Sequence, residues 1–149
     1  MYTKISENLS RILTFANEFN PVIIAVSKYY TVNEMREAFK VGLNNFGENR
    51  VLDAIEKINS LEEEITSKSH YHLIGHLQSN KGKKAVGVFD LIHSVDSIKL
   101  AVEIDSVAAQ KGIKQKILIQ VNNAGEQQKS GIAPSQLENL IEEIQGLNN

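Results

Sequence analysis

Short apolar segments alternate with amphipathic helical segments along the chain, and this alternation limits the possible folds more than any other feature. The predicted leading helix covers residues 5–19. A helix is predicted after each strand, and the helix after the third strand covers residues 79–86. The predicted strands are residues 22–26, 45–46, 71–74, 89–92 and 117–121. The first strand is apolar throughout and is expected to be buried on both faces. Strands separated by such helices indicate a parallel sheet with right-handed crossovers.

Local signals predict where several helices begin. Thr31 and Glu34 have the spacing of a capping box, in which each residue satisfies a free backbone amide of the first helical turn. Ser135 and Glu138 repeat this spacing before the last helix. Asp96 is expected to cap the helix that follows the fourth strand.

The length of the chain bears on the architecture. The chain has 149 residues and no Pro-, Gly- or Ser-rich linker, so residues 1–149 are predicted to form a single domain with a leading helix and five βα units. Such units form either an open, doubly wound sheet or part of a closed eight-stranded barrel. A closed barrel needs about 200 residues or more, so this chain is expected to be too short to close one alone.

Composition argues against several classes of function. Lys and Arg total 16 against 18 Asp and Glu, and the net charge of −2 argues against binding nucleic acid or an anionic membrane through bulk charge. The absence of cysteine excludes disulfides, thiolate metal sites and a cysteine nucleophile. No apolar run has the length of a membrane span, and no signal peptide is recognisable, so a soluble, cytoplasmic protein is expected. His70, His72 and His76 lack the spacing of metal ligands, and no metal site is expected.

Polar side chains gather where the predicted strands end. This edge is where parallel βα folds place their functional sites. Lys28, Asn49, His76, Ser94 and Asn122 come at or just after the ends of the first to fifth strands, in that order. We therefore expect these side chains to lie around one mouth.

Lys28 has the most distinctive chemistry of these residues. It follows an apolar strand directly, and partial desolvation there disfavours the charged ammonium form. A neutral amine can form a Schiff base with an aldehyde or ketone. The alternative is a lysine that extends its amine into water and has no chemical role. The residues alone leave both interpretations open.

Six motifs follow one another along the chain, namely AVSK at 25–28, FGEN at 46–49, HLIGHLQSNK at 72–81, HSVDS at 93–97, QVN at 120–122 and KSGI at 129–132. Taken in this order, they resemble those of the pyridoxal phosphate homeostasis proteins. The third motif is highly specific. Together the six motifs extend through essentially the whole chain.

The resemblance implies a fold like the N-terminal barrel of alanine racemase, with pyridoxal 5′-phosphate as the cofactor. It implies that Lys28 is the cofactor lysine, held as a Schiff base, and that Asn49 lies beside the cofactor ring. His76, Ser94 and Asn122 match positions that line the same mouth.

The resemblance also implies a carrier rather than an established catalyst. Members of that family look like carriers that bind the reactive aldehyde of the cofactor and affect vitamin B6 and amino-acid homeostasis. Lys129 matches a family lysine in the loop after the fifth strand, although a solvated lysine is an equal alternative. Two other interpretations stay open. One is a barrel enzyme of racemase or aldolase type that uses Lys28, and the other is a fragment unable to bind cofactor.

Glu48 is the nearest candidate proton carrier to Lys28 in the sequence. It is expected among the first residues of a helix, where a carboxylate favours the helix dipole. An enzyme of the racemase type needs a second acid or base on the opposite face of the cofactor, and no Tyr or Glu at these strand ends is an obvious candidate.

The resemblance further implies about three more βα units than this chain contains, including the segments that hold the cofactor phosphate. The chain is therefore expected to be a barrel truncated after about five strands, with reduced cofactor affinity. Its first and fifth strands would be unpaired edges, and a homodimer that covers them is expected.

Overall fold

Each strand of the sheet lies beside the strand that follows it in the chain. The computed structural model describes residues 2–78, 81–126 and 128–149. Its five-stranded sheet has the order β1-β2-β3-β4-β5, and all neighbouring pairs are parallel. The strands are β1 (Ala25–Val26), β2 (Asn45–Glu48), β3 (His70–Leu73), β4 (Leu91–Val95) and β5 (Lys116–Ile119).

Seven α-helices occur in the described part of the chain. They are α1 (Tyr2–Ala16), α2 (Val32–Lys40), α3 (Val51–Asn59), α4 (Glu63–Thr66), α5 (Gly82–Ala85), α6 (Ile98–Lys111) and α7 (Leu137–Gln145). Short 3₁₀ turns follow α1 at Asn17–Phe19 and precede α7 at Pro134–Gln136. Of the helix predicted over residues 79–86, positions 79–80 lie outside the described residues.

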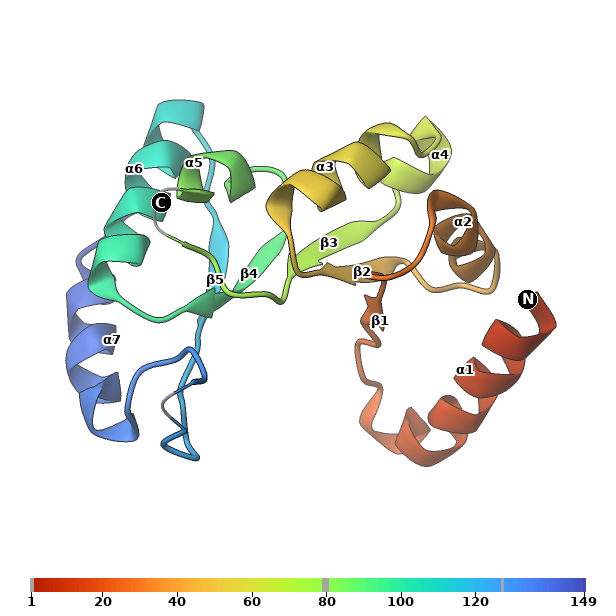
Figure 1. The fold of residues 1–149 in the computed structure, drawn as a ribbon, viewed down its shortest axis with the longest axis horizontal. Coiled ribbons are helices and arrows are strands. Elements are labelled where there is room, and N and C mark those ends of the chain that lie inside the picture. The colour runs from red at the N-terminus through yellow and green to blue at the C-terminus, as the bar shows by residue number, and fades with distance from the viewer. Residues whose placement is uncertain (1, 79–80, 127) are drawn as a thin grey trace.

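The strand order decides between the two predicted architectures. A doubly wound sheet reverses its strand order and carries helices on both faces. Here the order is sequential, and α2, α3, α5 and α6 all cover the same side of the sheet (Figure 1). Right-handed crossovers that always advance in one direction produce this arrangement, which is the wall of a barrel. The fold is therefore a TIM-barrel-like parallel α/β array with five strands.

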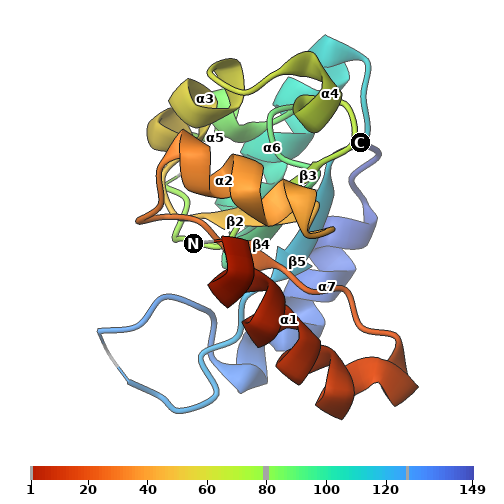
Figure 2. The same cartoon turned by 90° about the vertical axis from the view of Figure 1, so that its right-hand side faces the viewer.

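The hydrophobic core lies between the sheet and these covering helices. Phe46, Leu73 and Ile92 of three neighbouring strands are completely buried, and Met35 of α2 and Leu100 of α6 pack in the same cluster. Helices α1 and α7 lie at opposite ends of the array, where α1 is beside α2 and α7 is beside α6 (Figures 1 and 2).

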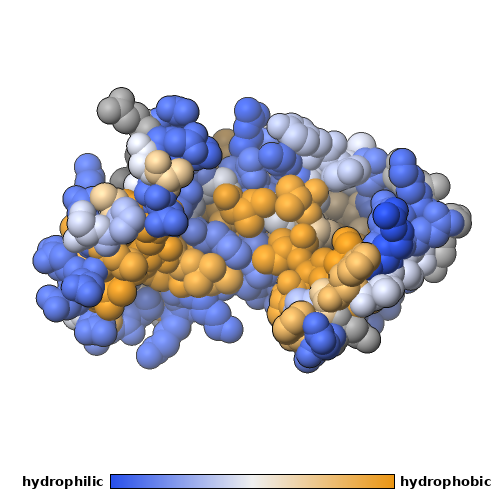
Figure 3. All heavy atoms as spheres, turned by 90° about the horizontal axis from the view of Figure 1, so that it is seen from below, coloured by the Kyte–Doolittle hydropathy of each residue, from blue (hydrophilic) through white to orange (hydrophobic). Residues whose placement is uncertain are grey.

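The other face of the sheet exposes apolar side chains. The prediction of a strand over 22–26 that is buried on both faces is wrong, because only Ala25 and Val26 form β1, and Val22 and Val26 are 71% and 46% exposed. Strand β1 has a neighbour on one side only, namely β2, within the described residues. Leu118 of β5 is also exposed, and a view from below shows apolar atoms across this side of the molecule (Figure 3).

The capping box of α2 is confirmed. The Glu34 amide donates to Thr31 Oγ1 over 3.3 Å, and the Thr31 amide donates to Glu34 Oε2 over 2.7 Å. These two bonds satisfy free amides of the first turn, and the hydrogen bonds from Thr31 lower the pKa of Glu34. This cap, three residues after Lys28, fixes the start of α2 at Val32.

Two other capping predictions are wrong. Ser97, not Asp96, caps α6, because Ser97 has the extended backbone of a cap and its Oγ accepts from the Leu100 amide. No capping box forms at Ser135, because Pro134 begins a 3₁₀ turn one residue earlier. In this turn the Ala133 amide donates to Gln136 Oε1 over 3.2 Å.

No helix in the described ranges has the length and apolar character needed to cross a membrane.

Candidate functional site

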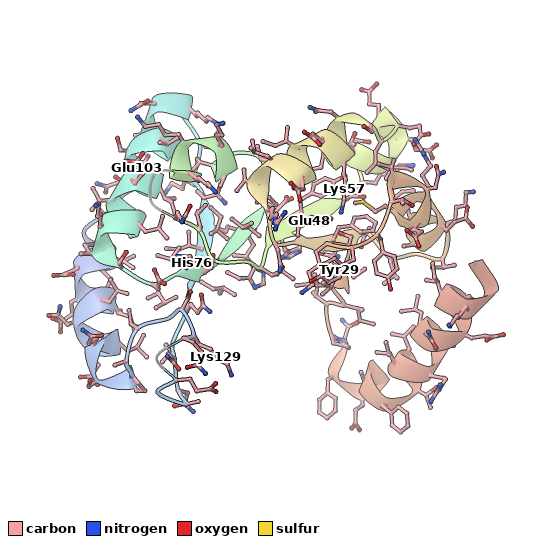
Figure 4. All side chains as sticks on the ribbon, viewed as in Figure 1. Tyr29, Glu48, Lys57, His76, Glu103 and Lys129 are labelled. Atoms are coloured by element: carbon pink, nitrogen blue, oxygen red, sulfur yellow. The ribbon has the colours of Figure 1, made fainter. Side chains whose placement is uncertain are left out.

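Lys28 lies in the turn that follows β1. Its side chain is partly buried, and its Nζ is 4.9 Å from the centroid of the Tyr29 ring. Tyr29 itself is 87% exposed, and the stick view shows it at the junction of β1 and α2 (Figure 4). None of the ion pairs formed by the described residues involves Lys28. The Lys28 side chain therefore leaves the carboxyl end of β1 next to the Tyr29 ring, with no ion-pair partner among the residues that the structure describes.

The end of β2 lies directly against the end of β3. Asn49 follows β2, and the Ile74 amide donates to the Glu48 carbonyl over 2.9 Å. A Cβ on Gly75 would lie 2.7 Å from the Asn49 Cα and closer still to the Asn49 carbonyl oxygen. Only glycine allows this approach of two backbones. The missing side chain of Gly75 thus lets the backbone of Asn49 lie directly against the end of β3.

His76 and Asp96 connect the ends of β3 and β4. His76 Nδ1 is 3.5 Å from Asp96 Oδ2, and the His76 side chain is 48% exposed. Figure 4 shows His76 near the middle of the sheet's carboxyl edge. Asp96, which was expected to cap a helix, instead faces this histidine.

Ser94 and Asn122 are placed differently from the other predicted site residues. Ser94 is within β4, 1% exposed, and its Oγ has no hydrogen-bond partner among the described residues. Asn122 follows β5, and its Nδ2 donates to the carbonyls of Glu126 over 2.8 Å and Lys129 over 3.2 Å. The Asn122 amide therefore holds the loop that follows β5. Lys129 in that loop pairs with the Glu126 carboxylate at 2.6 Å.

A buried ion pair between α3 and the end of β2 lies next to the residue before Lys28, and no sequence motif indicated it. Glu48 is the last residue of β2 and is 2% exposed, so its expected place at the start of a helix is wrong. Lys57 of α3 reaches back to Glu48, and the Nζ–Oε1 distance is 2.8 Å. Ser27 Oγ donates to the same carboxylate oxygen over 2.7 Å. Figure 4 shows Lys57 and Glu48 facing each other between α3 and β2.

Two histidines form a second polar cluster inside the sheet. His72 Nδ1 is 3.0 Å from His93 Nε2, and His72 Nε2 is 3.0 Å from Asn45 Oδ1. Burial lowers the pKa of both imidazoles, and the neighbouring His93 lowers that of His72 further. Both rings are therefore held in the neutral form, which fits a chain of hydrogen bonds in which each ring donates once.

This cluster predicts a loss of stability in mild acid. In the unfolded chain these histidines titrate near 6.5, and in the folded chain their pKa is lower. As pH falls below about 6.5 the unfolded state takes up protons first, so the free energy of unfolding decreases. Urea unfolding between pH 7.5 and 5.5 measures this loss. A wild-type stability that is flat over this range would contradict the prediction.

The fold and the site together define a class of protein, namely parallel α/β barrel proteins with a lysine directly after the first strand. Residues 2–149 match the family described as alanine racemase, N-terminal domain, and the chain belongs to this family. The resemblance to pyridoxal phosphate homeostasis proteins is confirmed. The chain is 33% identical over 140 residues to such a protein of Schizosaccharomyces pombe, covering 93% of this chain and 57% of the relative. The chain is 38% identical over 128 residues to the pyridoxal phosphate homeostasis protein of Vibrio cholerae, and the match covers 85% of this chain and 54% of that relative.

Solved structures show the same fold. PipY of Synechococcus elongatus PCC7942, with pyridoxal phosphate bound, is 37% identical with a TM-score of 0.81, covering 97% of this chain and 65% of PipY. An alanine racemase of Clostridium difficile is 16% identical with a TM-score of 0.75, covering 97% and 37%, and shares the fold alone. The chain spans little more than half the length of the Schizosaccharomyces pombe and Vibrio cholerae relatives.

Proposed function

We propose that this chain is a pyridoxal 5′-phosphate-binding protein of vitamin B6 and amino-acid homeostasis, which holds the cofactor covalently through Lys28. The observation that carries the proposal is the Lys28 amine, which is free of ion pairs among the described residues and lies at the carboxyl edge of the sheet. Pyridoxal phosphate bound in PipY, a relative of the same fold, supports this choice of ligand.

The side chains at this edge fit an aldehyde cofactor. Pyridoxal 5′-phosphate supplies an aldehyde carbon, which forms a C=N bond with a neutral lysine amine while the carbonyl oxygen leaves as water. Lys28 supplies that amine. Asn49 follows the next strand, β2, and packs against the backbone of Gly75, and from there its side chain would lie beside the cofactor ring. His76, which follows the third strand, would also line the mouth. Ser94 and Asn122 stay predictions as cofactor-binding residues.

A carrier fits this mouth better than a racemase or aldolase. Glu48, the nearest candidate proton carrier, already binds Lys57 and Ser27 and is 2% exposed. A general base must lie within hydrogen-bond reach of the proton that it abstracts. The buried Glu48 carboxylate, which is bound by Lys57 and Ser27, is poorly placed for that role. We therefore propose a non-catalytic protein.

The remaining expectations belong to the same proposal. Residues 1–149 are proposed to fold as one domain, located in the cytoplasm, that binds a small molecule and not nucleic acid. The exposed apolar side chains Val26 of β1 and Leu118 of β5 support a homodimer that covers the exposed edges of the sheet.

Borohydride reduction after incubation with pyridoxal 5′-phosphate tests the proposal. We expect one stable adduct per chain, located at Lys28 by peptide mapping, because reduction traps the C=N bond. In Lys28→Ala this adduct should be lost, and the labelling of any other single lysine should be at least about tenfold below that of Lys28 in the wild type, since 1.4 kcal/mol of site preference already gives that ratio. Lys129→Ala is the matched control and should label like the wild type. Equal labelling of many lysines, or an unchanged yield in Lys28→Ala, would contradict the proposal.

A further inference from the structure

We infer that Lys57 is a positioning residue for Lys28. The inference rests on the proposed function of Lys28 and adds a residue from a different element, helix α3. Lys57 does not reach the mouth of the sheet. It acts from behind, through the peptide group that precedes Lys28.

The contacts of Lys57 end on the backbone next to Lys28. Lys57 Nζ donates to the Ser27 carbonyl oxygen over 2.7 Å. This carbonyl belongs to the peptide bond that joins Ser27 to Lys28. The Tyr30 amide donates to the same oxygen over 2.9 Å. With both donors in place, the peptide plane at Lys28 has one orientation, and that plane sets the direction in which the Lys28 side chain leaves the backbone.

The same ammonium group also holds the end of the neighbouring strand. Lys57 Nζ is 2.8 Å from Glu48 Oε1, and Ser27 Oγ donates to that oxygen over 2.7 Å. Ser27 and Glu48 each precede a proposed cofactor residue, Lys28 and Asn49. The three-residue network therefore fixes the two strand ends relative to each other, in addition to the β1–β2 backbone pairing, which covers only two residue pairs.

Burial makes this network strong and sensitive to substitution. The side chains of Glu48 and Lys57 are 2% and 17% exposed, and Ser27 is 4% exposed. Charges that are shielded from water interact more strongly than charges on the surface, and removing one partner leaves the other charge buried without compensation. Surface pairs of this chain, such as Lys40–Glu37 with 62% and 31% exposure, lack this property.

The test compares Lys57→Met with Lys40→Met in the full chain. Both substitutions replace an ion-paired lysine with a neutral side chain of similar length. We measure the rate of borohydride-trapped attachment of pyridoxal 5′-phosphate to Lys28, and amide hydrogen exchange at Tyr30, whose donor binds the Ser27 carbonyl. Lys57→Met should slow attachment by on the order of tenfold or more, because a misplacement of about 1 Å can cost a factor of 100. Its Tyr30 amide should exchange at least about tenfold faster. Lys40→Met should change both by less than about twofold.

A double variant separates positioning from stability. Lys57→Met/Glu48→Gln removes the uncompensated buried charge and should regain most of the stability in urea. It does not restore the donor to the Ser27 carbonyl, so attachment should stay slow and Tyr30 exchange fast. Recovery of the attachment rate together with stability would overturn the inference, as would wild-type attachment and exchange in Lys57→Met. If wild-type chain gives no adduct, the proposed function fails, and unchanged Tyr30 exchange in the double variant would then overturn the positioning role separately.

Discussion

Gly75→Ala is expected to destabilise the chain by about 3 kcal/mol, at the upper end of the usual cost of overpacking. The new Cβ would lie 2.7 Å from the Asn49 Cα and 2.9 Å from its carbonyl carbon, and all of these contacts are with backbone. A flexible side chain could rotate away, whereas this backbone is fixed by the hydrogen bond from the Ile74 amide to the Glu48 carbonyl. Either β2 and β3 separate at their ends or Asn49 is displaced. Urea unfolding measures the loss of stability.

Gly146→Ala is the matched control for this substitution. Gly146 has φ −77°, and its nearest new contact is the Glu143 carbonyl oxygen at 3.5 Å, an ordinary van der Waals distance. The change should stay within about 0.5 kcal/mol. We also expect Gly75→Ala to impair attachment of pyridoxal 5′-phosphate at Lys28 through displaced Asn49. Equal unfolding midpoints for the wild type and Gly75→Ala would show that the two strand ends are not in contact.

Phe46→Ala is expected to cost about 3–5 kcal/mol of folding free energy, the usual range for a buried aromatic side chain. Phe46 is completely buried in β2, and its ring centroid is 6.2 Å from that of Tyr71 on β3. It also borders a half-open pocket of about 390 Å³ between α1, β1 and α2. Removing the ring would join its vacated volume to this pocket, and the loss should lie within this range.

The exposed phenylalanine of α1 provides the comparison. Phe15 is 82% exposed, so Phe15→Ala should change the free energy of unfolding by less than about 0.5 kcal/mol. Urea titrations followed by circular dichroism give both values. A small effect of Phe46→Ala would mean that the core between the sheet and α2 is loosely packed. Because most domains have only about 5–15 kcal/mol of stability, the expected loss is enough to unfold a marginal variant.

Much of the local structure could be predicted from the sequence. Strands β2 to β5 lie at or near their predicted positions, and the capping box of Thr31 and Glu34 forms as expected. These features depend on residues a few positions apart, which the sequence presents directly. Predictions failed where two local signals competed, as at Asp96 and Ser97, or where Pro134 began a turn ahead of the expected cap.

The sequence by itself determined the alternation of strands and helices, the family motifs and the choice of Lys28 as the residue with distinctive chemistry. Only the tertiary structure decided the sequential strand order, the exposure of Val26 and the use of Glu48 as a buried partner of Lys57. The reason is the range of the interactions. Lys57 and Ser27 are 30 residues apart and meet only because α3 folds back over the sheet. Periodicity indicates which face of an element is apolar, but which distant side chain meets that face follows from the packing of the whole sheet.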